Sequence, residues 1–196
     1  MKINKSKLYL ISGVLVVLLV GGFFLLDYKT SKTAVKEGSK STPESKFALL
    51  SNAHTNFCAK ADFINSKSDD ERLQGSCCSK MDFHRYMEQI EGLKKYSQIS
   101  QIPKDPYDIP VSLAKELLGY KKSIVLTSEQ QMIYDGAMKM SHEHGPCCCK
   151  CWRWDAFEGL AKFLITKYNF NSEQIAEVWD LIDGCGGKGH EHGAVA

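Results

Sequence analysis

Four cysteines crowd into five residues of this chain, and this crowding limits what the chain can fold into. The segment 142–151 reads HEHGPCCCKC and contains Cys147, Cys148, Cys149 and Cys151. Neighbouring cysteines rarely bridge one another, because a disulfide needs Cα atoms about 4.4–6.8 Å apart with converging side chains. The chain has eight cysteines in 196 residues, and the other four are Cys58, Cys77, Cys78 and Cys185. This clustering predicts a common thiol site rather than a set of separate crosslinks.

The N-terminal segment is typical of a membrane anchor. Residues 1–7 carry three lysines, and residues 8–26 form a run of 19 residues without a charge. As a helix this run would be about 28 Å long, close to the ~30 Å hydrocarbon core of a bilayer. We expect an uncleaved signal anchor that crosses the cell membrane once, with residues 1–7 cytoplasmic and the C-terminal domain outside. Residues 27–46, rich in Lys, Ser and Thr, are expected to form a flexible linker.

Beyond the linker, apolar residues recur at helical spacing, which predicts an all-α domain over residues 47–186. Helices are expected over 47–58, 82–96, 112–120, 127–140, 152–168 and 171–183. Thr127 and Asn171 are each followed three residues later by a glutamine, which is the spacing of a helix-capping pair. The proline-rich stretch 99–110 is expected to be an extended connection.

A short pattern repeats at an offset of 70 residues. The segment 75–80 reads GSCCSK, the segment 145–150 reads GPCCCK, and each leads into a predicted amphipathic helix. The repeat predicts two cysteine-rich loops at helix starts, consistent with an internal duplication. A helical bundle would be able to bring these two loops face to face.

The cluster favours metal binding in either of two local conformations. In an extended backbone, residues two apart point the same way, so Cys147, Cys149 and Cys151 would converge with Cys148 opposite. If the helix begins early, Cys147 and Cys151 instead share one helix face. The unpaired amides at a helix start also stabilise thiolate over thiol. Further thiols that would complete a four-ligand set are Cys77, Cys78 and Cys185.

Thiolates are soft ligands, and they select Cu(I) or Zn(II) over Mg or Ca. His142 and His144 are candidate nitrogen ligands, with solvated polar side chains as the alternative interpretation. Residues 187–196 are expected to be a flexible tail that carries a second pair, His190 and His192. We therefore predict a soft-metal-binding protein, not an enzyme, that stores, senses or transfers its ion. The expected partners are the membrane, through residues 8–26, the metal ion and, for transfer, a protein that accepts the ion.

Two other functions remain open. Cys148 and Cys151 form a Cys-x-x-Cys at a predicted helix start, the arrangement of thiol–disulfide oxidoreductases. Alternatively, disulfides staple the domain and its function lies on an interaction surface. Nucleic-acid binding is excluded, because the formal net charge is only +2 and the lysines are scattered.

The stretch 107–151 resembles the bacterial PCYCGC-motif proteins. The resemblance is carried by YDIP at 107–110, by a helical segment with a histidine before the cluster, and by PCCCKC at 146–151, which matches P-C-x-C-x-C. It implies a membrane-anchored extracytoplasmic protein with a role in metal binding. The ligands that it implies are Cys147, Cys149 and Cys151.

Overall fold

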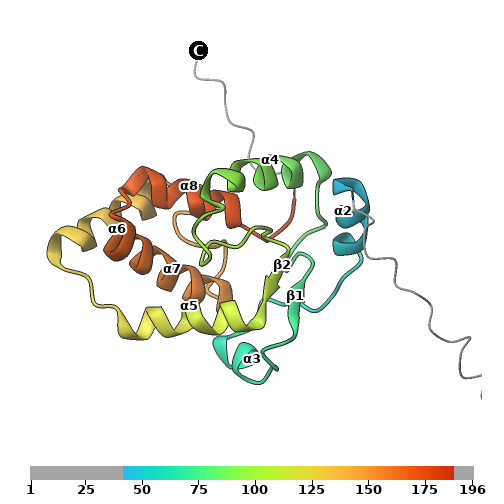
Figure 1. Cartoon of the computed structure of the whole chain (residues 1–196), viewed down its shortest axis with the longest axis horizontal. Helices are drawn as coiled ribbons and strands as arrows, with labels where there is room; N and C mark the ends of the chain where they lie inside the picture. Colours follow the sequence, from blue (N-terminus) through green and yellow to red (C-terminus); the bar gives the residue numbers. More distant parts are fainter. Residues whose placement is uncertain (1–41, 188–196) are drawn as a thin grey trace, which may run out of the picture. The chain divides into compact units, whose positions relative to one another are not determined.

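The structure, a computed structural model, describes residues 42–187, which form a mostly helical domain (Figure 1). This confirms the helical class that the periodicity predicts. The elements are α2 (Pro43–Ser51), α3 (Ala61–Asn65), β1 (Arg72–Gln74), α4 (Phe83–Leu93), the 3₁₀ helix η1 (Lys94–Tyr96), β2 (Asp108–Pro110), α5 (Val111–Ser123), α6 (Ser128–Met140), α7 (Trp152–Tyr168) and α8 (Ser172–Ile182).

Several predictions concern residues outside this range. The anchor at 8–26, the linker up to residue 41 and the histidine pair of the tail all lie outside the described residues. Within residues 42–187, no helix is both long and apolar enough to cross a membrane.

Local sequence signals fix the ends of three helices. Thr127 and Asn171 accept hydrogen bonds from backbone N–H groups three residues on, and the glutamines there accept in return from the cap N–H groups. This exchange satisfies amides that a helix start otherwise leaves without partners, and it confirms the predicted starts of α6 and α8. Helix α7 has the predicted bounds and ends where Asn169 adopts a left-handed conformation (φ 54°).

The sequence predictions differ from the structure in three places. The first helix begins at Pro43 and ends at Ser51, so Cys58 lies in a loop rather than at a helix end. Helix α3 has five residues, too few to show a helical period. The fold is also not purely helical, since β1 and β2 pair antiparallel with Leu73 opposite Ile109. Strands of three residues are too short to show alternation.

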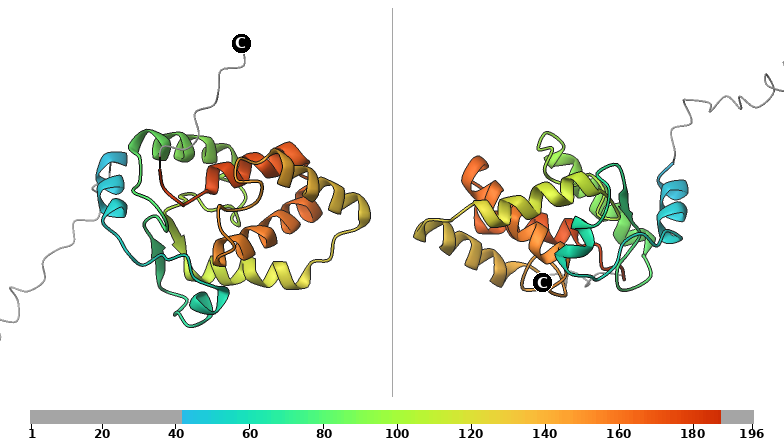
Figure 2. Two further views of the ribbon diagram at one scale, coloured as in Figure 1. Left: turned by 180° about the vertical axis from the view of Figure 1, so that it is seen from behind. Right: turned by 90° about the horizontal axis from the view of Figure 1, so that it is seen from below.

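Helix α7 lies at the centre of the core. It packs along α5, while α8 packs against α6 and α4 (Figures 1 and 2). Nine of its 17 residues are buried, among them Trp152, Phe157 and Leu160. Each fully buried large apolar side chain stabilises the fold by about 1.5–3 kcal/mol. This burial holds the start of α7 in place, and with it the cysteine segment that precedes the helix.

The close packing of α5 and α7 depends on Gly159. A Cβ atom at this position would lie 2.0 Å from the carbonyl oxygen of Leu117 and 2.7 Å from the amide nitrogen of Lys121, both backbone atoms of α5. We predict that Gly159→Ala lowers the free energy of unfolding by about 2 kcal/mol, because neither atom can rotate away. Chemical unfolding measures this change.

Gly119→Ala is the matched control within α5. No atom lies within 4 Å of the place that a Cβ would take at Gly119. Alanine is more stable than glycine inside a helix by roughly 0.5–1 kcal/mol, so the two substitutions should have effects of opposite sign. Equal effects would contradict the backbone contact at Gly159.

Candidate metal centre

The eight cysteines converge from four segments of the chain, and all are free thiols. Cys58 follows α2, Cys77 and Cys78 precede α4, four cysteines precede α7, and Cys185 follows α8. The Sγ–Sγ distances are 2.8 Å for Cys148–Cys185, 3.1 Å for Cys58–Cys78, 3.4 Å for Cys58–Cys149, 3.5 Å for Cys147–Cys185, 3.7 Å for Cys77–Cys78, and 3.9 Å for Cys77–Cys185 and Cys78–Cys148. The last contact confirms that the two predicted cysteine loops meet.

The loop that carries Cys58 is held against the first turn of α7. The backbone N–H of Trp152 donates to the carbonyl of Ala59 (2.7 Å), and its indole Nε1 donates to Oδ1 of Asn56 (3.2 Å). Asn56 is itself buried and donates from Nδ2 to the carbonyl of Gly75 (3.0 Å). These bonds join the Cys58 loop both to α7 and to the loop before α4.

The segment after α8 pairs with the loop before α4 through its backbone. The amide of Cys77 donates to the carbonyl of Gly184 (3.2 Å), and the amide of Ser79 donates to the carbonyl of Cys185 (2.8 Å). Backbone hydrogen bonds fix the register of two segments far more tightly than side chains do. These backbone hydrogen bonds therefore hold Cys77 and Cys185 next to each other.

The segment 147–151 adopts neither conformation considered from the sequence. It is a series of bends that ends at Cys151, the N-cap of α7. The Sγ atoms of Cys147, Cys148 and Cys149 lie within 4.8 Å of one another. The expectation that Cys148 points away is therefore wrong, because alternation requires a straight strand. Cys151 is buried, and its thiol is hydrogen-bonded to Cys147.

Four sets of three side chains have the spacing to hold a metal ion. They are Cys58, Cys78, Cys149; Cys77, Cys78, Cys185; Cys147, Cys148, Cys149; and Cys147, Asp183, Cys185. Within each set the ligand atoms lie within 4.8 Å of one another. Three sulfurs bound at about 2.3 Å to one ion would lie about 4.0 Å apart. Each set therefore fits an ion with small movements of its side chains.

The thiols differ in how readily they lose a proton. The pKa of Cys147 lies well below its ordinary range, because its sulfur is hydrogen-bonded to Cys151 and Cys185 and because Arg153 adds positive charge. The hydrogen bond between Cys77 and Cys185 is also the main reason why the pKa of Cys77 is lowered to about 6. The same hydrogen bonds raise the pKa of Cys151 and of Cys185, and burial raises the pKa of Cys58, Cys78 and Cys148. Thiolate, the metal-binding form, is therefore favoured at Cys147 and Cys77.

The positive charge beside these thiols is buried. Arg153 is fully buried, its Nη2 donates to the carbonyl of Pro106 (2.7 Å), and its Cζ lies 5.1 Å from the ring centre of Trp152. Its Nε and Nη1 have no hydrogen-bond partner among residues 42–187. Gly184 packs so closely on the guanidinium that a Cβ would lie 2.4 Å from Cζ. A charge in this position requires negative charge nearby, and the groups that interact with it electrostatically include Cys147, Cys77 and Asp183.

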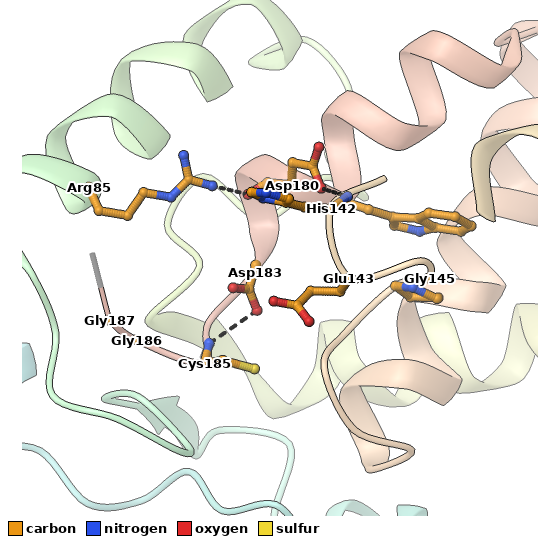
Figure 3. A pocket seen from close by; sticks show the side chains of 11 residues that line it. Arg85, His142, Glu143, Gly145, Asp180, Asp183, Cys185, Gly186 and Gly187 are labelled. Atoms are coloured by element: carbon orange, nitrogen blue, oxygen red, sulfur yellow. Dashed lines mark hydrogen bonds between the residues drawn. The ribbon is translucent and has the colours of Figure 1, made fainter. Parts of the chain in front are cut away.

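A pocket of 210 Å³ lies beside the cluster (Figure 3). Cys185 lines it together with Asp183, Glu143, His142 and Arg85. In Figure 3 the carboxylates of Asp183 and Glu143 face the same space near the sulfur of Cys185. Burial raises the pKa of Asp183. The pocket joins a polar, acid-lined surface to a buried sulfur of the cluster.

The predicted ligands differ in where the structure places them. Six of the seven predicted cysteines belong to the four sets, and Cys151 lies beside them. His142 and His144 are exposed, and neither belongs to a set formed by the described residues. Cys58 and Asp183 join the sets without having been predicted as ligands. Asp183 precedes Cys185 by two residues, and this spacing would have indicated Asp183 as a candidate ligand. Cys58 has no other cysteine near it in the sequence, so no such signal exists for it.

Comparisons of the chain with protein-family models, with curated proteins and with solved structures found no match.

Arg153 should favour thiolate formation in the cluster. We predict that Arg153→Met, which removes the charge and keeps most of the volume, raises the first thiol ionisation midpoint by about 1 on the pH scale. The sign follows from the charge, since a nearby cation stabilises thiolate and lowers the pKa. Ultraviolet thiolate absorbance of the reduced, metal-free full-length protein, followed against pH, measures the midpoint.

Two variants control this measurement. Arg153→Lys keeps the charge and should leave the midpoint near that of the wild type. Lys150→Met removes a charge from an exposed position of the neighbouring loop, where solvent screens it. Equal shifts in Arg153→Met and Lys150→Met would refute a specific effect of the buried guanidinium.

Proposed function

We propose that this protein is a membrane-anchored, extracytoplasmic binding protein for soft metal ions, Cu(I) or Zn(II), which it stores, senses or transfers. One observation carries the proposal: eight free thiols from four segments meet in one network. Thiolate is the ligand that selects these ions over harder cations. The buried Arg153 supports it, because a cation at this place stabilises anionic sulfur.

The spacing of the thiols supports an ion over crosslinks. A disulfide joins two sulfurs, but Cys78 has three sulfurs within 3.9 Å of its own, those of Cys58, Cys77 and Cys148. A thiolate with several sulfur neighbours is well placed to share a metal ion with them. This arrangement favours coordination over a fixed pairing.

The contacts of Cys148 and Cys151 do not favour a thiol–disulfide oxidoreductase. Exchange needs an accessible nucleophile with a resolving thiol beside it. Cys151 is 4% exposed and is hydrogen-bonded to Cys147, while Cys148 lies 2.8 Å from Cys185. The two thiols of the Cys-x-x-Cys are thus each paired elsewhere.

An ion would reach the cluster through the pocket that Cys185 lines. The carboxylates of Asp183 and Glu143 attract a cation there, and His142 offers a nitrogen ligand at the same pocket. Removing the carboxylate of Glu143, which belongs to none of the four sets, should slow uptake more than it weakens final binding.

Native mass spectrometry of the full-length protein tests metal binding. We predict that reduced protein gains Cu(I) or Zn(II), loses one proton for each thiolate formed, and resists alkylation until a competing chelator removes the metal. Cys147→Ser combined with Cys185→Ser should weaken binding at least tenfold, because three of the four sets lose a ligand. His84→Gln, an exposed residue in none of the sets, is the control.

The following result would contradict metal binding. Protein purified without a chelator carries four disulfides and no metal, and it unfolds when a reductant is added but not when a chelator is added.

The proposed location rests on the apolar run at 8–26 and on the resemblance to anchored extracytoplasmic proteins. We predict that the full-length chain stays in the membrane fraction after alkaline extraction. Its thiols should react with a membrane-impermeant maleimide added to intact cells together with a membrane-impermeant chelator. Deleting residues 8–26 should release the protein from the membrane. Labelling that appears only after lysis would contradict the outward orientation.

A further inference from the structure

The four ligand sets are linked by shared thiols. Cys78, Cys149, Cys147 and Cys185 each belong to two sets, whereas Cys58, Cys77, Cys148 and Asp183 each belong to one. Every set therefore shares one thiol with each of two other sets. The four shared thiols connect the four sets into a closed ring.

We propose that the cluster holds a ring of four monovalent soft ions, with Cu(I) as the biological example, each bound by three ligands and bridged to two neighbours by shared thiolates. The inference rests on the proposed metal binding and adds the number, charge and connection of the ions. Each thiol that binds releases its proton to solvent. No electron is transferred, because copper arrives as Cu(I).

The geometry favours three-coordinate ions. Structural Zn(II) is almost always bound by four ligands, whereas each set offers three. The contacting sulfurs that belong to one set lie 3.1–3.9 Å apart, from Cys58–Cys78 to Cys77–Cys185. Around one ion they would lie about 4.0 Å apart. Ions can therefore enter by a small expansion of the network. Cys151 stays outside the ring and is hydrogen-bonded to the shared sulfur of Cys147.

The balance of charge favours monovalent ions. Seven thiolates and one carboxylate carry eight negative charges. Four monovalent ions would reduce the net charge of the ring to −4, whereas four divalent ions would reduce it to zero. Arg153 is fully buried, and two of its nitrogens lack partners within the described domain. An anionic ring compensates this guanidinium, whereas a neutral one does not. Solvent stabilises the remaining charge at the exposed residues Cys58, Cys78 and Cys148.

Titration of the reduced full-length protein with Cu(I), without oxygen, tests the ring. Native mass spectrometry should show mainly the metal-free and four-copper species at intermediate ratios, because a bridged ion is stable only with its neighbours in place. X-ray absorption should show about three ligands per copper and a short copper–copper distance. Saturation at any other number, or the lack of a copper–copper distance, would overturn the ring. Failure to bind any metal would instead overturn the proposed function.

Cys78→Ser and Cys58→Ser form a matched pair of variants. Both cysteines are exposed, and their Sγ atoms lie 3.1 Å apart, but only Cys78 is shared between two sets. Cys78→Ser should weaken the binding of two of the four ions, because two sets each fall to two thiolates and lose the bridge between them. Cys58→Ser should weaken the binding of one ion, because one set loses a ligand and every bridge remains. The same number of weakened ions in the two variants, with wild-type circular dichroism, would overturn the bridging.

Discussion

The first turn of α7 is buried, and the cysteine site depends on that burial. The first N–H groups of a helix have no partner inside the helix. Here the amide and the indole of Trp152 hold the loop of Cys58, and the neighbouring Arg153 donates to Pro106, just before β2. Loops that lie far apart in the sequence thereby close around one helix end. The positions of the thiols are set by hydrogen bonds of the folded domain, before an ion contributes.

The buried guanidinium and the thiols stabilise each other. An unpaired charge in a protein interior costs several kcal/mol, and the hydrogen bond from Arg153 to Pro106 offsets only part of that cost. Thiolate at Cys147 or Cys77 and the carboxylate of Asp183 can supply negative charge, and Arg153 lowers the pKa of all three groups through its charge. A bound ion would keep the two sulfurs anionic at lower pH. Under the proposed function, metal binding and folding would therefore be coupled through this one residue.

The sequence predicted the helices well and the site in part. Capping pairs and helical periodicity act within one or two turns, so α6, α7 and α8 could be predicted from them. The crowding of cysteines indicated a common site, and the repeat indicated that two loops meet. The contact of Cys58 with Cys149 could not be predicted, because 91 positions separate them and the intervening fold brings them together. Alternation failed at Cys148 because its segment bends at successive residues.

The exposure of the cluster separates it from a purely structural metal site. Structural zinc sites are closed, with four protein ligands around the ion. Here Cys147 and Cys185 are buried on the side of Arg153, whereas Cys58, Cys78 and Cys148 are exposed. A thiol of another molecule can attack an ion from the exposed side and displace one thiolate at a time, while the buried ligands keep the fold intact. Such a site would hold ions through its buried ligands and release them to a competing thiol at its exposed ones, which favours the proposed storage or transfer over a role in folding alone.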